Sequence, residues 1–169
     1  MIIWLTGLPC SGKTTIAYAL AARLRQECLQ VEVLDGDDIR PRFWSELGFS
    51  RQERDINVLR FAALACMFSN HGIIAIVSVV SPHRATRDAI HKIAADFLEV
   101  YVNASLEVCE ARDVKGMYKR ARAGEIKNFT GLDGSYEKPL NPDVECATDR
   151  ETVEECVIKI LAKIQEKQQ

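Results

Sequence analysis

The chain has 169 residues, a formal net charge of −2 at neutral pH and 47% hydrophobic residues. This length fits a single domain over residues 1–169, and the near-average composition argues against a disordered or collagen-like chain. The near-neutral charge argues against a surface devoted to nucleic acid or to anionic lipid, so we expect neither as a partner.

The apolar segments are short and the cysteines are isolated. The longest apolar run, residues 73–80, is far below the roughly 20 residues needed to span a bilayer. Six cysteines occur without a CxxC pair, and no basic stretch precedes the apolar N-terminus. We therefore expect a cytoplasmic protein with reduced thiols, and we expect those other than Cys10 to be buried.

Apolar runs alternate with helical patterns along the chain. Strands are predicted at residues 2–5, 31–34, 73–80 and 98–102. Helices are predicted from about residue 12 and at residues 51–70, 85–95, 106–111 and 152–164. This alternation predicts an α/β fold, a three-layer sandwich in which helices cover both faces of a parallel sheet.

Residues 113–142 lack this periodicity and contain four glycines and two prolines. A stretch of that length without regular structure is usually functional in a compact domain. We expect this segment to be a mobile lid over a ligand site.

Residues 7–14 read GLPCSGKT between the first predicted strand and helix, and match the pattern GxxxxGK[ST]. Glycines let backbone N–H groups turn toward a phosphate, Lys13 would reach the β- and γ-phosphates, and the Thr14 hydroxyl would hold Mg²⁺. The chain is therefore expected to bind a nucleoside triphosphate with Mg²⁺, in a fold of the P-loop kinase type. The predicted nucleotide contacts are Gly7, Leu8, Pro9, Cys10, Ser11, Gly12, Lys13, Thr14 and Thr15.

Acidic residues follow the second predicted strand, at Asp35, Asp37 and Asp38. Ligands of such sheets bind at the carboxyl ends of the strands, so these carboxylates would face the phosphate loop, position Mg²⁺ and accept a proton. A solvated acidic turn is the alternative. Residues 113–116 fit the GTPase pattern DxxG, but no NKxD follows, and Ser81 stands where a motor ATPase has an acidic residue. A small-molecule kinase is favoured.

Residues 112–127 contain six basic and two acidic residues, inside a chain whose net charge is −2. Arginine and lysine stabilise charge on a transferring phosphoryl group. The pattern therefore indicates a lid that faces an anionic substrate, with a solvated helix face as the alternative.

Blocks along nearly the whole chain carry a family resemblance. They are residues 7–14, DGDDIR at 35–40, GFS at 48–50 with Arg54 and Asn57, IVSVVSP at 76–82, DVKG at 113–116 and KRARAGEIKNFTG at 119–131. Together they resemble the adenylylsulfate kinase (APS kinase) family. The resemblance implies phosphorylation of the 3′-hydroxyl of adenosine 5′-phosphosulfate (APS) by ATP, giving 3′-phosphoadenylyl sulfate (PAPS) and ADP, in sulfate assimilation.

The resemblance also implies roles for individual residues. Lys13, Asp37, Asp35 and Ser81 match the catalytic positions, with Asp37 directed at the 3′-hydroxyl and Asp35 joining Thr14 nearer the metal; the order of the two aspartates stays open. We expect Ser81 to contact substrate through its backbone, with a phosphoserine intermediate as the alternative.

Phe49 and Phe129 match the pair that holds the substrate adenine between two aromatic rings. Because Phe129 lies in a polar segment, a core position is the weaker interpretation for it. The implied substrate contacts are Asp35, Asp37, Arg40, Phe49, Arg54, Asn57, Val80, Ser81, Lys115, Lys127, Asn128 and Phe129.

The family resemblance suggests a homodimer, for which the predicted helix at 51–70 could supply an apolar face. Two other functions stay open. One is another small-metabolite kinase of this fold, acting on a nucleoside, a sugar acid or shikimate. The other is a nucleotide-binding regulatory module without acceptor turnover.

Overall fold

The computed structural model describes residues 1–167, and across them five strands form one parallel sheet in the order β2-β3-β1-β4-β5. The strands are β1 (Ile2–Thr6), β2 (Val31–Asp35), β3 (Ile74–Ser78), β4 (Phe97–Asn103) and β5 (Val144–Ala147). The helices are α1 (Lys13–Gln26), α2 (Gly36–Phe43), α3 (Arg51–Asn70), α4 (Arg84–Ile93), α5 (Leu106–Arg112), α6 (Met117–Arg122) and α7 (Val153–Lys167).

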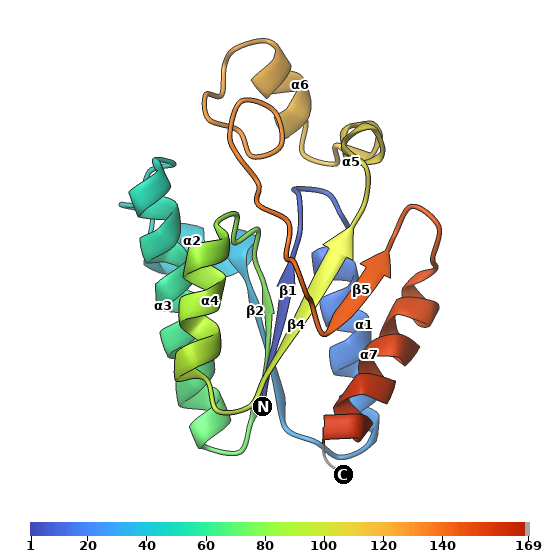
Figure 1. Ribbon diagram of the computed structural model, residues 1–169. Helices are drawn as coiled ribbons and strands as arrows, with labels where there is room; N and C mark the ends of the chain where they lie inside the picture. The colour runs from blue at the N-terminus through green and yellow to red at the C-terminus, as the bar shows by residue number, and fades with distance from the viewer. Residues whose placement is uncertain (168–169) are drawn as a thin grey trace.

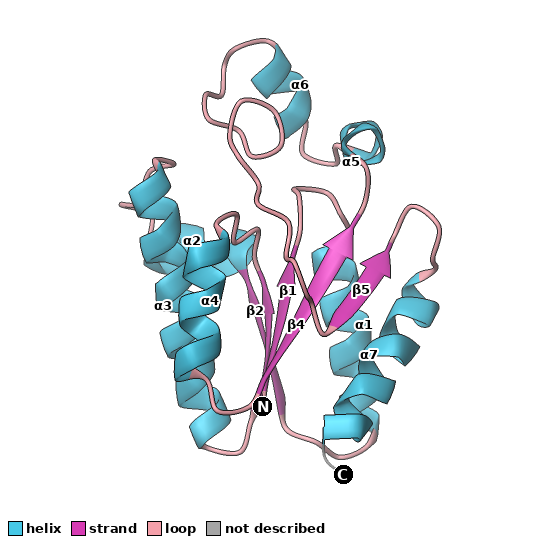
Figure 2. Ribbon diagram, in the orientation of Figure 1, coloured by secondary structure: helices cyan, strands magenta, loops and turns pink. Residues whose placement is uncertain are grey.

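Helices cover both faces of the sheet, which confirms the predicted three-layer sandwich (Figure 1). Helices α1 and α7 pack on one face over a cluster that contains Ile3 and Leu5. Helices α3 and α4 pack on the other face over a cluster that contains Trp4 and Val77. Because both faces are buried, the central strands are apolar at nearly every position rather than alternating. Figure 2 shows α5 and α6 beyond the carboxyl ends of the strands.

Three elements were not predicted from the sequence. Helix α2 begins directly after β2 because the Asp35 side chain accepts a hydrogen bond from Asp37 N at 2.8 Å and caps the first turn. Helix α6 lies inside the segment 113–142, which is therefore not wholly irregular; Asp113 accepts hydrogen bonds from Tyr118 N and Lys119 N at 3.0 Å. Strand β5 has only four residues, too few for a periodic signal.

The strand predicted at residues 73–80 ends two residues earlier, at Ser78. Ser78 is the last residue of β3 in register with both neighbours, opposite Leu5 of β1 and Asp35 of β2. The chain then turns, and Ser81 has a φ of 39°, in the left-handed region that a non-glycine residue rarely adopts. The turn at 79–82 therefore stands at the carboxyl edge of the sheet.

The expectation that every cysteine other than Cys10 is buried is wrong for two of them. Cys28 is exposed and Cys66 is half-buried, whereas Cys109, Cys146 and Cys156 are buried. Cys28 follows the end of α1, where the chain turns with a φ of 61°, and so leaves the core. Within residues 1–167, no helix combines the length and the apolar character needed to cross a bilayer.

Candidate active site

The phosphate loop joins β1 to α1 and requires glycine at both ends. A Cβ atom at Gly7 would lie 2.3 Å from the carbonyl oxygen of Val102, so only glycine allows this close approach to β4. Gly12 has a φ of 102°, in the left-handed region, directly before the first residue of α1. The loop therefore ends at a helix N-terminus, where backbone N–H groups and the helix dipole favour an anion.

Lys13 is buried within this loop. Its Nζ donates to the carbonyl oxygens of Leu8 at 2.7 Å and Gly7 at 3.1 Å. Burial lowers the pKa of Lys13 to about 8, and the negative charges of Asp37 and Asp35 oppose this shift. A phosphate placed at the loop would stabilise the ammonium further, because it brings a negative charge next to it.

Thr14 and Asp35 form the second half of the nucleotide side of the site. Thr14 Oγ1 donates to Asp35 Oδ2 at 2.7 Å, which confirms that a carboxylate after β2 faces the phosphate loop. A hydroxyl and a carboxylate oxygen this close are ligands that suit Mg²⁺. No group of three His, Cys, Asp or Glu residues able to hold a metal occurs within residues 1–167. The oxygens of Thr14 and Asp35 therefore fit a cation that takes its remaining ligands from phosphates and water.

Asp37 faces the cleft from the first turn of α2. Its Oδ2 pairs with Lys115 Nζ at 2.9 Å, and Lys115 comes from the lid segment that follows α5. This contact joins the floor of the cleft to the lid. Both side chains are exposed, so the pair is weak and its groups are free to exchange it for a ligand.

Two arginines meet the ring of Phe49. The guanidinium carbons of Arg40 and Arg54 lie 4.2 Å and 5.5 Å from the ring centroid. Phe49 is nevertheless 53% exposed, which leaves ring surface open to stacking. Burial lowers the pKa of both guanidinium groups, and for Arg54 the nearby Arg40 lowers it further. Two cations held this close together favour an anionic ligand beside the ring.

Arg54 also reaches the lid. It donates to the Phe49 carbonyl oxygen at 2.9 Å, to Thr130 Oγ1 at 2.9 Å and to the Asn128 carbonyl oxygen at 2.6 Å. One side chain of α3 therefore joins Phe49 to the residues on either side of Phe129. The sequence placed these residues in separate blocks, and only the fold brings them together.

Phe129 is only 5% exposed, and the expectation that a core position is its weaker interpretation is wrong. Its ring packs edge-to-face on Tyr118 of α6, with centroids 4.8 Å apart. The side chain of Asp133 accepts hydrogen bonds from the Asn128 and Phe129 amides at 2.7 Å and 2.6 Å. The lid thus has a small apolar core of its own, because helix α6 supplies the aromatic partner that the sequence pattern did not indicate.

Asn57 and Ser11 each carry a buried oxygen without a hydrogen-bond partner among the described residues. A buried polar group left unpaired costs free energy comparable to a lost hydrogen bond. Asn57 lies one turn along α3 from Arg54, so its Oδ1 atom fits a donor group of a ligand.

Among the other expected residues, Lys127, Asn128, Thr14 and Thr15 are exposed at the surface.

The turn after β3 is held by neighbouring strands. Thr6 Oγ1 donates to the Val80 carbonyl oxygen at 2.8 Å, and Trp4 Nε1 donates to Ser81 Oγ at 3.0 Å. Ser81 is buried, and its hydroxyl is the acceptor for the indole N–H of the core residue Trp4. The backbone of Val80 and Ser81 is positioned at the same edge of the sheet as the phosphate loop.

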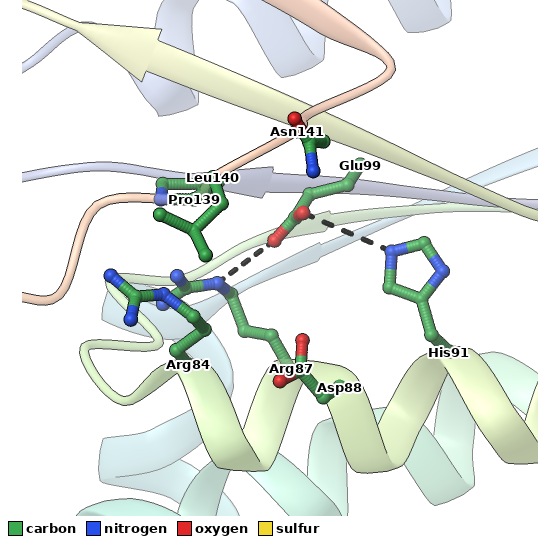
Figure 3. A pocket seen from close by; sticks show the side chains of 8 residues that line it. All are labelled: Arg84, Arg87, Asp88, His91, Glu99, Pro139, Leu140 and Asn141. Atoms are coloured by element: carbon green, nitrogen blue, oxygen red, sulfur yellow. Dashed lines mark hydrogen bonds and ion pairs between the residues drawn. The ribbon is translucent and has the colours of Figure 1, made fainter.

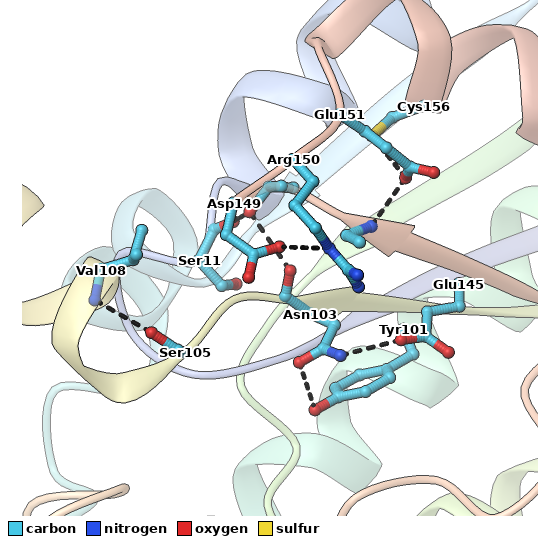
Figure 4. Close-up of polar contacts among 12 residues, drawn as sticks. Ser11, Tyr101, Asn103, Ser105, Val108, Glu145, Asp149, Arg150, Glu151 and Cys156 are labelled. Carbon is cyan, nitrogen blue, oxygen red and sulfur yellow. Dashed lines mark hydrogen bonds and ion pairs between the residues drawn. The ribbon is translucent and has the colours of Figure 1, made fainter.

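Sequence reasoning missed the residues that support the phosphate loop from behind. Thr148 Oγ1 donates to the Ser11 carbonyl oxygen at 2.7 Å, and Arg112 donates to the Thr148 carbonyl oxygen at 2.6 Å. Tyr118 donates to the Pro9 carbonyl oxygen at 2.9 Å. Figure 4 shows Ser11 near polar contacts at the ends of β4 and β5, among them those of Asn103 with Tyr101 and Glu145. Thr148 directly follows the carboxyl end of β5, so a prediction of this strand would have placed Thr148 beside the phosphate loop.

The fold and the site together define a P-loop phosphotransferase with an acidic cleft floor and a basic lid. A profile of the family described as adenylylsulphate kinase matches residues 1–147. The chain belongs to this family.

Individual relatives agree with this assignment. Adenylyl-sulfate kinase of Rippkaea orientalis is 53% identical over 164 residues, which cover 97% of this chain and 91% of the relative. Adenylyl-sulfate kinase of Halothermothrix orenii is 47% identical over 165 residues, which cover 98% of this chain and 89% of the relative. The solved Mycobacterium tuberculosis APS kinase CysC, in complex with AMPPNP and APS, is 34% identical, with a TM-score of 0.93 over 97% of this chain and 96% of that one. Aquifex aeolicus shikimate kinase, at 17% identity, a TM-score of 0.57 and coverage of 99% and 98%, shares the fold alone.

Proposed function

We propose that this protein transfers the γ-phosphoryl group of ATP to the 3′-hydroxyl of APS, giving PAPS and ADP. The observation that carries the proposal is a set of contacts beside the phosphate loop. Thr14 of that loop bonds Asp35, Asp37 two residues further along pairs with Lys115 of the lid, and Arg40 and Arg54 lie against the ring of Phe49. A donor and an acceptor of matching chemistry would meet between them.

On the donor side, Lys13 balances charge on the β- and γ-phosphates, and residues 7–15 surround them, with backbone N–H groups at the N-terminus of α1 directed at the phosphates. Thr14 and Asp35 would hold Mg²⁺, which neutralises charge as the γ-phosphoryl group moves. Asp37 accepts the proton of the attacking 3′-hydroxyl, the new O–P bond forms, and the bond to the leaving ADP oxygen breaks. No proton or electron is left over once Asp37 releases its proton to water.

On the acceptor side, Phe49 and Phe129 enclose the adenine. Phe49 offers exposed ring surface for stacking, and Phe129 is the buried ring that Tyr118 holds in place within the lid. Arg40, Arg54 and the unpaired Asn57 oxygen suit the phosphosulfate and ribose. The proposed acceptor contacts also include Asp35, Val80, Ser81, Lys115, Lys127 and Asn128.

Ser81 contacts substrate through its backbone and is not phosphorylated in the reaction. Its hydroxyl accepts a hydrogen bond from Trp4, and in-line transfer needs no covalent intermediate. We predict that Ser81→Ala lowers kcat by less than tenfold in a coupled ADP-release assay. A loss of well over a hundredfold, in a variant that keeps its melting temperature, would instead support a phosphoserine.

The protein acts as a homodimer in the cytoplasm. Support for the compartment comes from its six free cysteines, since such thiols are typical of reducing environments. Support for assembly comes from the exposed apolar side chains along α3, which include Leu59 and Met67.

An acceptor panel tests the function. ADP release is measured with ATP–Mg²⁺ and, in turn, APS, adenosine, shikimate and a sugar acid. We expect turnover with APS to exceed turnover with the others by at least a hundredfold in kcat/KM. A preference for another acceptor would favour a different small-metabolite kinase, and ATP binding without any acceptor-dependent turnover would favour a regulatory module.

A further inference from the structure

Arg87 of α4 is a charged side chain that the proposed reaction does not use. It is only 1% exposed, although it borders a cavity of about 190 Å³ between α4 and the end of the lid segment. Figure 3 shows it reaching from α4 to Glu99, with Pro139 and Leu140 of the lid segment nearby. A fully buried guanidinium is costly unless each of its donors is satisfied.

The three donor directions of Arg87 go to three different segments. Nε donates to Glu99 Oε1 of β4 at 2.8 Å, Nη1 donates to the Ser81 carbonyl oxygen at 2.6 Å, and Nη2 donates to the Glu137 carbonyl oxygen at 2.6 Å. Glu99 alone would neutralise the charge. The other two bonds fix main-chain atoms, one in the turn after β3 and one at the end of the lid.

The turn at Ser81 needs such support. Its φ of 39° is sparsely populated for residues with a side chain, and such conformations persist only where the surroundings determine them. Trp4 holds the Ser81 hydroxyl, but the Ser81 carbonyl oxygen is held by Arg87 and, at a longer distance of 3.4 Å, by Thr6 Oγ1.

The same arginine holds the returning end of the lid, residues 136–138, against this turn. Glu137 N donates to the Pro82 carbonyl oxygen at 2.8 Å, and Arg84 N donates to Glu137 Oε2 at 2.8 Å. The Arg87 guanidinium also lies 5.9 Å from the centre of the Tyr136 ring. Turn and lid end therefore form one bonded unit with Arg87 at its centre.

We propose that Arg87 is a positioning residue that joins the lid end to the Val80–Ser81 turn, so that the lid and the acceptor side of the cleft keep one geometry. This role rests on the proposed function only in naming APS as the acceptor. The bonds that Lys13 and Thr14 make go to other residues, so we expect the ATP side to be largely independent of Arg87.

The first test needs no acceptor. In hydrogen exchange of the ligand-free protein, Arg87→Met should speed exchange in both 79–82 and 136–138 by at least tenfold. The double variant Arg87→Met/Glu99→Met removes the unpaired buried carboxylate and keeps the test valid if the single variant folds poorly. Arg25→Met is the matched control, because Arg25 also ties a helix to a backbone carbonyl, that of Val31, on the other face of the sheet. Unchanged exchange in either segment would overturn the proposal.

The second test separates positioning from charge balance. With Arg87→Met we expect the KM for APS to rise at least tenfold and the KM for ATP to change less than twofold. Arg87→Lys keeps the charge beside Glu99 but cannot reach three acceptors, so it should retain most of the defect. Full rescue by lysine, or equal changes in both KM values, would overturn the proposal. If the wild-type enzyme does not use APS at all, the proposed function fails, and the exchange result alone decides the role of Arg87.

Discussion

Asp37 and Asp38 are adjacent at the start of α2, yet their partners differ. Asp37 pairs with Lys115 of the lid, whereas Asp38 pairs with Arg42 one helical turn along α2 at 2.6 Å. Only Asp37 therefore lies at the junction of cleft floor and lid.

This difference gives a matched pair of variants. Asp37→Asn should lower kcat by about 10²–10⁴-fold, because general-base catalysis contributes that much and an amide cannot accept the proton. Asp38→Asn keeps the same change of charge outside the cleft and should lower kcat by less than threefold. Steady-state ADP release with APS measures both. Similar losses in the two variants would remove Asp37 from the proposed role.

Lys13 gives a prediction about pH. Its pKa of about 8 lies below the ordinary value of 10.5. Between these two pH values the lysine keeps its proton in the unfolded chain and loses it in the folded chain. This group therefore makes folding more favourable as pH rises through that range. Below about pH 8 the buried ammonium is charged and this contribution is lost.

ATP has the opposite preference, because its phosphates stabilise the charged lysine. Binding at pH 8.5 should take up a proton, and ATP affinity should fall as pH rises above about 8. Titration calorimetry in buffers of different ionisation enthalpy measures the uptake. Lys13→Met should abolish it, whereas Lys163→Met, at a half-buried position of α7, should not. Absence of uptake in the wild-type protein at pH 8.5 would contradict the assigned state of Lys13.

At the residue scale, the motif and its spacing predicted the phosphate loop after β1 and the position of Asp35 opposite that loop. Both follow from the carboxyl ends of two strands that come one after the other in the chain, β1 and β2. The joint contact of Arg54 with Phe49 and the lid could not be predicted in the same way, since it brings together residues 76 positions apart. Arg87 gave no signal, because a lone arginine in a helical pattern is ordinarily a surface residue.

At the scale of elements, the lid differs most from the sequence prediction. Residues 113–142 contain α6, and their Tyr118 and Phe129 form an apolar cluster with Cys109 of α5. A six-residue helix whose first turn donates to the Asp113 side chain is too short to give a periodic pattern. Helix α3, by contrast, matches its predicted bounds because a capping box of Ser50 and Glu53 sets its start.

The two aromatic residues of the proposed adenine site call for different variants. Phe129→Ala would remove a buried ring at a cost of about 3–5 kcal/mol and so affect the whole lid. Phe49→Ala removes an exposed ring and should leave the melting temperature nearly unchanged. We expect it to raise the KM for APS about tenfold, since stacking contributes about 1–3 kcal/mol per base, and to leave the KM for ATP within twofold.

Phe43→Ala is the control for Phe49, because Phe43 at the end of α2 is also exposed, and within residues 1–167 neither Arg40 nor Arg54 lies over its ring as both do over that of Phe49. It should change neither KM value. An equal rise in both KM values after Phe49→Ala would mean that the ring does not separate acceptor from donor.

At the scale of the whole molecule, α3 presents an apolar surface opposite its packed face. Its C-terminal half borders a hollow of about 320 Å³ lined by Leu64, Met67, Phe68, His71 and Ile73. Exposed apolar surface of this kind usually marks a contact site.

Sedimentation velocity should therefore give a particle of two chains for the wild-type protein. Met67→Glu should shift the equilibrium toward a single chain, because a carboxylate would be buried in the contact. Ile158→Glu makes the same change at an exposed position of α7 and should leave the dimer intact. A single-chain wild-type protein, or dissociation by Ile158→Glu alone, would contradict the proposed face.

The topology of the sheet explains why so much of the architecture follows from the sequence. Buried parallel strands read as apolar runs, and this signal predicted β1, β3 and β4 inside the sheet and β2 at one edge. The other edge strand, β5, has only four residues, and the loop after it supports the phosphate loop through Thr148.

The position of the transferred phosphoryl group tests the central claim most directly. The wild-type protein is incubated with ATP, Mg²⁺ and APS, and the product is examined by phosphorus NMR with coupling to the ribose protons. We predict one new phosphomonoester, coupled to the proton on C3′, formed in equal amount to ADP. A phosphate on another atom, or ADP formed without a new phosphomonoester, would contradict the account.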